Sequence, residues 1–196
     1  MQQRSLATRT KLLDAALICF AADGYNAATV DAICSKAEVS KGAFYHHFPT
    51  KHGIFLALLH GWLKTVDGGL AASQQDTVPE TLRRMISMLP TIFIAADDHI
   101  VMFLEFWLRA NRDQEIWSAT IAPYRRYTAF FADLVEQGIA EGSFAPVDAQ
   151  VVARMMMSMT IGFLLQGLMD NQQPDWGNVA QEGMQLFIDS LRKDIS

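Results

Sequence analysis

The chain has 196 residues, of which 51% are hydrophobic and 19% charged, which is enough for one large or two small domains with a buried core. The net charge of −5 is unevenly distributed: residues 1–60 hold 6 Lys or Arg against 4 Asp or Glu, and residues 61–196 hold 10 against 17. The resulting nets of +2 and −7 argue against an architectural protein that coats nucleic acid, and leave the N-terminal part as the place for a local phosphate contact.

The cysteines and the apolar segments indicate the compartment. Cys19 and Cys34 lack metal-ligand spacing, so we expect small buried apolar groups in a reducing cytoplasm. The N-terminus has no basic start followed by an apolar run, so secretion is not expected. The longest apolar stretch, residues 155–169, is too short to cross a bilayer. We therefore predict a buried helix there and no membrane partner.

The first two predicted helices lie close together in the chain. A helical period runs over residues 5–22, and Asp23 and Gly24 suit its C-cap. Thr29 is the predicted N-cap of a short helix over residues 30–37, whose apolar residues share one face.

A third short helix carries the most informative residues. Ser40 is its predicted N-cap, while Gly42 and Ala43 keep its first turn thin enough to approach base edges. We expect Phe44 and Phe48 in the core, tying this helix to the first one. Tyr45 lies about 100° away from Phe44 on the helix, which favours an exposed phenol. Helix, three-residue turn and helix with a polar front form a helix-turn-helix motif, whose second helix enters the major groove.

Residues 8–59 resemble the tetracycline-repressor-like (TetR) family of transcriptional regulators. The likeness rests on Ala15, Ala16, Phe20, Gly24, Tyr25, Ala28, Thr29, Val30, Ile33, Ala37, the run of residues 39–48, and Lys51. His52 and Gly53 depart from the family pattern, which favours an acidic residue or a good helix former there. Beyond about residue 60 the likeness is one of helical layout only.

The resemblance implies a set of DNA-contacting residues. It assigns His47 and Lys51 to phosphate and His46 to the groove side, although a solvated surface lysine is the alternative for Lys51. His46, His47 and His52 lack the four-residue spacing and the nearby carboxylate of a metal site, so we predict no metal and no cofactor. The predicted DNA contacts are Thr29, Ser40, Lys41, Gly42, Ala43, Tyr45, His46, His47 and Lys51.

The remainder of the chain has helical patterns and no persuasive strand. Thr50 is a plausible cap for a fourth helix ending near Gly68, Pro79 begins a fifth, and Pro90 ends or kinks it. Further helices are predicted over residues 97–111, up to residue 142 with a bend at Pro123, over 148–170, and over 177–193. We predict an all-α protein of about nine helices, with a helix-turn-helix domain of residues 1–50 and a helical ligand-binding and dimerisation domain of residues 51–196.

The resemblance implies an apolar cavity in the second domain, and flexible Met side chains suit such a cavity. Tyr127 and Gln166 are the polar groups expected to orient a ligand. Glu105 could select a cationic ligand, or form an exposed pair with Arg109. The candidate lining residues are Met85, Met88, Met102, Phe103, Phe106, Trp107, Tyr124, Tyr127, Met155, Met159, Phe163 and Gln166, and the alternative is that most of them only fill a helical core.

Small residues near the C-terminus suggest a dimer interface. Ser158 and Gly162 are four residues apart, and Gly167 adds another bare patch. With the last helix they would form a two-fold four-helix interface. A buried contact within one chain is the alternative.

These features predict a cytoplasmic homodimeric repressor, and no catalytic constellation competes with that reading. We expect its partners to be double-stranded palindromic operator DNA and a small apolar or amphipathic inducer, whose signal passes through the fourth helix. The alternative from another class is an all-helical enzyme or carrier of apolar molecules, in which the N-terminal helices are only structural.

Overall fold

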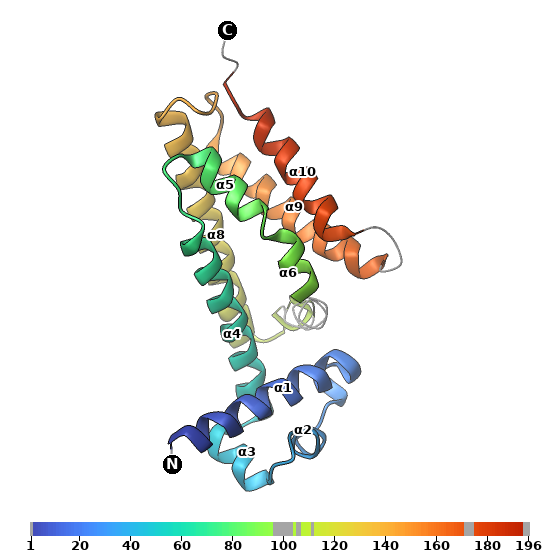
Figure 1. The fold of residues 1–196 in the computed structure, drawn as a ribbon. Helices are drawn as coiled ribbons and strands as arrows, with labels where there is room; N and C mark the ends of the chain where they lie inside the picture. The colour runs from blue at the N-terminus through green and yellow to red at the C-terminus, as the bar shows by residue number, and fades with distance from the viewer. Residues whose placement is uncertain (1, 96–103, 105–106, 111, 171–174, 194–196) are drawn as a thin grey trace. The chain divides into compact units, whose positions relative to one another are not determined.

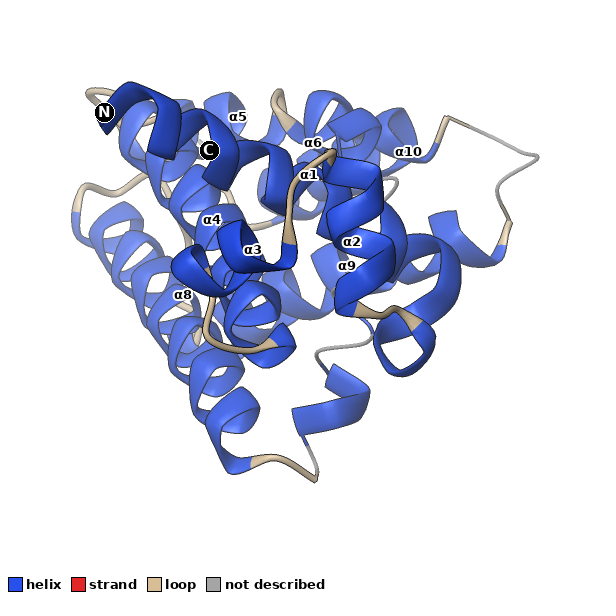
Figure 2. Cartoon of the chain, turned by 90° about the horizontal axis from the view of Figure 1, so that it is seen from below, coloured by secondary structure: helices blue, strands red, loops and turns tan. Residues whose placement is uncertain are grey.

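The computed structural model describes residues 2–95, 104, 107–110, 112–170 and 175–193. Within these residues it has nine named helices and no strand, which confirms the all-α class (Figures 1 and 2). Most of the predicted helix over residues 97–111 lies outside the described residues. The helices are α1 (Gln2–Ala27), α2 (Val30–Ala37), α3 (Lys41–His47), α4 (Lys51–Ala72), α5 (Val78–Ile86), α6 (Leu89–Ala95), α8 (Gln114–Ala140), α9 (Ala149–Met169) and α10 (Trp176–Ser190).

Two compact units make up the chain. Unit 1 comprises Met1–Thr65 and Asp98–Thr120, and unit 2 comprises Val66–Asp97 and Ile121–Ser196. The ranges of α4 and α8 each include residues of both units.

The predicted start of α2 is confirmed in detail. Gly24 interrupts α1 with φ 72° and ψ 162°, a left-handed region that glycine adopts without strain, and helical turns resume as far as Ala27. Thr29 then has extended backbone angles, and its side chain accepts a hydrogen bond from the Ala32 amide at 3.1 Å. The cap sets both the first residue and the direction of α2.

The turn between α2 and α3 is tight. Glu38 ends α2 in the left-handed conformation, with φ 56° and ψ 44°, while its amide bonds back to the last turn of the helix. Ser40 is the N-cap of α3, as predicted, and accepts from the Ala43 amide at 3.1 Å. Phe44 and Phe48 are buried, which confirms their predicted role in the core of unit 1.

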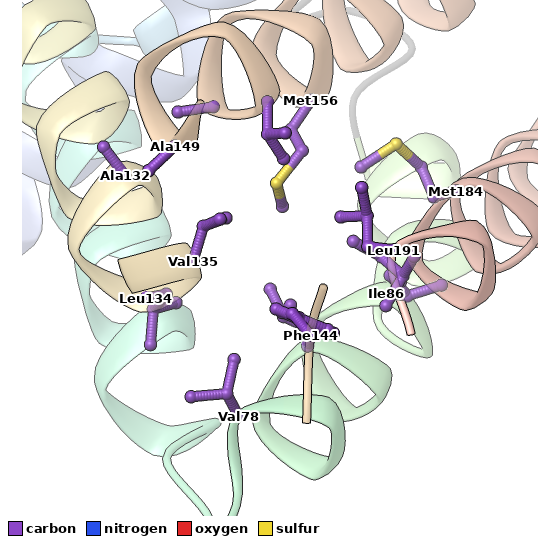
Figure 3. Close-up of a cluster of buried hydrophobic side chains, with 14 residues drawn as sticks. Val78, Ile86, Ala132, Leu134, Val135, Phe144, Ala149, Met156, Met184 and Leu191 are labelled. Carbon is purple, nitrogen blue, oxygen red and sulfur yellow. The ribbon is translucent and has the colours of Figure 1, made fainter. Parts of the chain in front are cut away.

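The core of unit 2 brings together α5, α8, α9 and α10 (Figure 3). Phe144, in the loop between α8 and α9, is 1% exposed and lies against the backbone of Gly138, where a Cβ atom would come within 2.4 Å of the ring. Beside α9, α10 also packs on α5 and α6 (Figure 1). Met156 and Met184 bring flexible apolar side chains into the same core.

Helix α9 departs from the prediction of a buried helix. It has 21 residues, so by length and composition alone it could cross a membrane, which is weak evidence for one. Only 17% of its most apolar window is buried within the chain. Its fully buried residues, Ala149, Val152, Ala153 and Met156, all lie in its first half, and Met159 and Phe163 pack partly buried against the same core. The prediction was wrong because hydrophobicity shows that a surface needs covering, and says nothing of whether the same chain covers it.

Candidate DNA-binding site

Helix α3 has one buried face and one polar, accessible face. Phe44 is fully buried, whereas Tyr45, at the next position, is 52% exposed. Lys41, Gly42 and His46 are also exposed, and Ala43 and His47 are half-buried. The predicted contact residues of α3 therefore lie on its accessible face, which a DNA groove could cover. Phe44 and Phe48 fix the position of this polar front by packing in the core of unit 1.

An ion pair crosses from α2 to α3. The Lys41 Nζ atom lies 2.6 Å from Asp31 Oδ1, with both side chains more than 60% exposed. The hydrogen bond to Asp31 raises the pKa of Lys41, so the lysine stays charged. Exposed pairs of this kind contribute little free energy, so Lys41 can exchange the carboxylate for a phosphate or a base.

The three histidines near the helix-turn-helix, His46, His47 and His52, separate into two groups. The rings of His46 and His47 lie 5.2 Å apart at the C-terminal end of α3. His52 points elsewhere: its Nε2 atom is 3.1 Å from Glu115 Oε2, and its Nδ1 atom 4.0 Å from Asp113 Oδ2. Among the described residues no group of three His, Cys, Asp or Glu side chains could hold a metal ion.

Lys51 is placed differently from the other predicted contacts. Its Nζ atom donates to the carbonyl oxygens of Tyr25 at 2.7 Å, Ala28 at 2.8 Å and Asn26 at 3.3 Å, and lies 4.4 Å from the centre of the Tyr25 ring. Burial, together with the nearby charge of Arg109, lowers the pKa of Lys51. This geometry favours an internal role over the predicted phosphate contact.

Arg109 contacts the same turn, and sequence reasoning did not connect it with the DNA-binding end. Its guanidinium stacks 4.0 Å from the centre of the Tyr25 ring, and Nη1 donates to Asn26 Oδ1 at 2.7 Å. The two partners are 83 residues apart in the chain, so no local signal could have revealed the contact. Glu105, the alternative partner of Arg109, lies outside the described residues.

The candidate ligand residues lie in several environments. Met85, Met159 and Phe163 pack against the core of unit 2, Met88 accepts a hydrogen bond from the Ser73 hydroxyl at 3.4 Å, and Tyr124 is half-buried. Trp107 belongs to unit 1 and is 43% exposed. Gln166 is exposed and donates to the Gly162 carbonyl of its own helix at 3.3 Å. Met102, Phe103 and Phe106 lie outside the described residues.

Tyr127 is the candidate with a defined polar environment. Its hydroxyl is buried and donates to Asp67 Oδ1 at 2.8 Å, and Arg126 Nη2 bonds the same carboxylate at 2.7 Å. Burial, reinforced by the hydrogen bond to Asp67, raises the pKa of Tyr127 to about 12. The phenol is therefore neutral and fixed in direction within unit 2.

The small residues of α9 do not share one environment. A Cβ atom at Gly162 would meet nothing within 4 Å, and Ser158 is exposed. Gly167 faces the Trp176 side chain of α10, so it contributes to the packing of α9 against α10 within the chain.

A helix-turn-helix with a buried anchor and an exposed polar front, followed by an all-helical second part, defines a DNA-binding transcriptional regulator. Residues 12–58 match the bacterial regulatory proteins of the tetR family, and residues 78–192 match the C-terminal domain of BetI-type transcriptional repressors. The chain belongs to the tetR family, and it is a ligand-responsive DNA-binding repressor.

Individual relatives agree with this assignment. The repressor KstR2 of Mycobacterium tuberculosis is 30% identical over 158 residues, which cover 78% of this chain and 77% of KstR2. The regulator UidR of Escherichia coli K12 is 23% identical over 84% of this chain and 83% of UidR. A transcriptional regulator from Saccharomonospora viridis, solved in complex with choline, has the same fold with a TM-score of 0.81 and 23% identity, covering 92% of this chain and 95% of that one.

Proposed function

We propose that this repressor binds a palindromic operator as a homodimer, with α3 of each protomer in a major groove. The exposed front of α3 over its two buried phenylalanines carries the proposal. In this arrangement Lys41 and Tyr45 reach base edges, and His47 lies toward phosphate. The full contact set is Thr29, Ser40, Lys41, Gly42, Ala43, Tyr45, His46 and His47.

A stripe of exposed residues with one half-buried glycine, Gly162, along α9 supports dimerisation. We use the name α9 stripe for Val151, Met155, Ser158, Gly162, Leu165 and Met169. These positions recur at intervals of four and three residues, so they lie on one side of the helix, as in helix-to-helix packing seams. Its large members are between 37% and 87% exposed, and the bare Gly162 at its centre lets a second helix approach closely. The stripe is the proposed contact with a second copy.

A membrane is a weaker explanation for the same surface. Gln150, Arg154 and Gln166 are exposed on α9 beside the stripe, and a charged guanidinium within a lipid-facing helix is costly. Dimerisation covers one side of the helix and leaves these polar groups in water. We therefore propose a cytoplasmic protein without a membrane partner and without catalytic activity of its own.

We propose an apolar or amphipathic inducer that binds in unit 2. The ketosteroid regulator KstR2, whose structure has a TM-score of 0.74 and 24% identity and covers 95% of each chain, supports an apolar ligand, and the choline complex of the Saccharomonospora viridis regulator supports a ligand with a polar, cationic end. In this chain the Asp67 carboxylate and the Tyr127 hydroxyl would hold the polar end of the ligand, since both are fixed in place. Met88 and Tyr124 would supply adaptable apolar contact.

The operator experiment uses the DNA that flanks the protein's own gene. Fluorescence anisotropy with duplexes from that region should give saturable binding that survives excess unrelated duplex. Tyr45→Ala should weaken specific binding by roughly 1 to 3 kcal/mol if the phenol reads a base. A protein that binds none of these duplexes better than unrelated DNA would favour the enzyme or carrier alternative.

The ligand experiment tests reciprocity. A compound found by thermal-shift screening must favour the released conformer by about 5 kcal/mol to turn a mostly bound population into a mostly free one. Operator DNA must weaken the binding of that compound by the same factor. Equal affinity with and without operator would show that the compound's site is not the sensor.

A further inference from the structure

Two cations from distant parts of unit 1 hold one turn. The turn, residues 25–28, joins the kinked end of α1 to Thr29, the N-cap of α2. Lys51, in the first turn of α4, donates to three of its carbonyl oxygens, at 2.7, 3.3 and 2.8 Å. An ammonium group has three N–H donors, so these contacts use all of them.

Arg109 contacts the same turn through the side chains of its residues. It donates to the Asn26 side chain at 2.7 Å and stacks on Tyr25, which is 8% exposed and packs on Phe55 with the ring centres 4.5 Å apart. Lys51 and Arg109 are both positively charged and repel each other. Their contacts with the backbone carbonyl oxygens, the Asn26 amide oxygen and the face of the Tyr25 ring offset this repulsion. The arrangement is therefore built around the turn and does not present a free cation to solvent.

The turn controls the position of the predicted DNA contacts. Thr29 follows it directly, and its side chain begins α2 by accepting from the Ala32 amide. Helix α2 packs against α3, so a displaced turn would move the polar front of α3 as well. An error of about 1 Å in such a supporting contact is enough to weaken a binding site strongly.

We propose that Lys51 and Arg109 are positioning residues for operator binding, which act through the turn of residues 25–28 and do not contact phosphate. This inference rests on the proposed binding of DNA by α2 and α3. The operator experiment above tests DNA binding with the unaltered chain, so a failure of the proposed function can be distinguished from a failure of this inference.

The first test is the salt dependence of operator binding by the full chain. We compare Lys51→Met and Arg109→Met with Lys41→Met, a matched removal of an exposed cation on α3, over about 50 to 200 mM salt. Lys41→Met removes an exposed cation from the surface proposed to enter the negatively charged groove, so it should lower the slope of log affinity against log salt by about one unit even if the lysine reaches a base. Lys51→Met and Arg109→Met should lower affinity about tenfold at every salt concentration, with the slope unchanged. A slope lowered by about one unit in Lys51→Met would make that lysine a phosphate contact and overturn the proposal.

A double-mutant cycle between Arg109 and Asn26 tests whether Arg109 acts through the turn. This test remains valid even if the Lys51→Met variant does not fold. If Arg109 acts through Asn26, then Arg109→Met, Asn26→Ala and the double variant should lose operator affinity to a similar extent. Hydrogen exchange of the amides at residues 25–30 should rise in all three, while those of α10 stay as in the unaltered chain. Independent losses that multiply in the double variant, or operator affinity unchanged in Arg109→Met, would overturn the proposal.

Discussion

Asp31 of α2 and Lys41 of α3 form an exposed ion pair, with Lys41 Nζ 2.6 Å from Asp31 Oδ1, so the carboxylate would compete with DNA for the charge of the lysine. Asp31 also brings a negative charge close to the surface that would face phosphate. Asp31→Asn should therefore strengthen operator binding, most clearly at low salt. The free energy of unfolding should change by less than about 1 kcal/mol, because exposed pairs contribute little.

Anisotropy titrations at two salt concentrations check this expectation. Asp14→Asn, at an exposed position of α1, is the matched control for the change in net charge. Equal gains in the two variants would mean that the effect is one of net charge alone. A loss of affinity in Asp31→Asn would mean that the pair holds Lys41 in its binding conformation.

Glu38 is the one non-glycine residue with positive φ among the described residues, and it stands at the turn between α2 and α3. A side chain in the left-handed region costs about 1 to 2 kcal/mol, part of which glycine recovers at the expense of a more flexible unfolded chain. Glu38→Gly should therefore raise the free energy of unfolding by about 1 kcal/mol.

Denaturant unfolding measures this change. Glu136→Gly, the same substitution at an exposed position inside α8, should lower the free energy of unfolding by about 1 kcal/mol. Glu38→Gln separates the loss of charge from the change in backbone freedom. If Glu38→Gln stabilises as much as Glu38→Gly, the charge and not the backbone is responsible.

The helix-turn-helix could be predicted closely because its signals are local. Thr29 and Ser40 each bond an amide three residues ahead, and residue type alone indicates such a cap. The fourth helix shows the limit of this reasoning. It passes the predicted end at Gly68 and continues to Ala72, because the Ser73 hydroxyl bonds the Gly69 carbonyl and α4 packs near Met88.

The internal roles of Lys51 and Arg109 depend on contacts that no local pattern shows. A lysine after the recognition helix is typical of a phosphate contact, and only the folded chain brings it to the carbonyl oxygens of residues 25, 26 and 28. The sequence pattern likewise predicted that α9 is apolar, and could not indicate that large apolar residues such as Met155 and Met169 stay exposed in one chain.

The proposed dimer contact can be tested at the centre of the α9 stripe. Gly162 has open space where a Cβ atom would lie, so a large side chain fits the isolated chain and obstructs a second copy. Gly162→Trp should sediment as a monomer and lose operator affinity about a hundredfold or more, since the two half-sites are then bound independently. The variant chain should keep the circular dichroism of the unaltered protein and should still bind a single half-site weakly.

Gly68→Trp is the matched control, because a Cβ atom at Gly68, on α4, also meets nothing within 4 Å. That variant should remain a dimer that binds the operator. If Gly162→Trp is itself a dimer with full operator affinity, the interface lies elsewhere.

The buried phenol of Tyr127 makes a prediction at alkaline pH. Its pKa in the folded protein is about 12, against an ordinary value of 10, because burial and the hydrogen bond to Asp67 favour the neutral form. Below pH 10 the Tyr127 phenol keeps its proton in both the folded and the unfolded chain, so this group does not change the free energy of unfolding. Between pH 10 and 12 the phenol ionises only in the unfolded chain. The free energy of unfolding therefore falls with rising pH, by at most about 3 kcal/mol. Tyr127→Phe should reduce this alkaline loss of stability, measured by urea unfolding at each pH. The pH dependence that remains comes from other groups, such as Tyr25, because burial also raises the pKa of Tyr25. Asp67→Asn should shift the ultraviolet titration of Tyr127 to lower pH. A titration of Tyr127 that stays the same in the Asp67→Asn variant would show that the carboxylate does not hold the phenol.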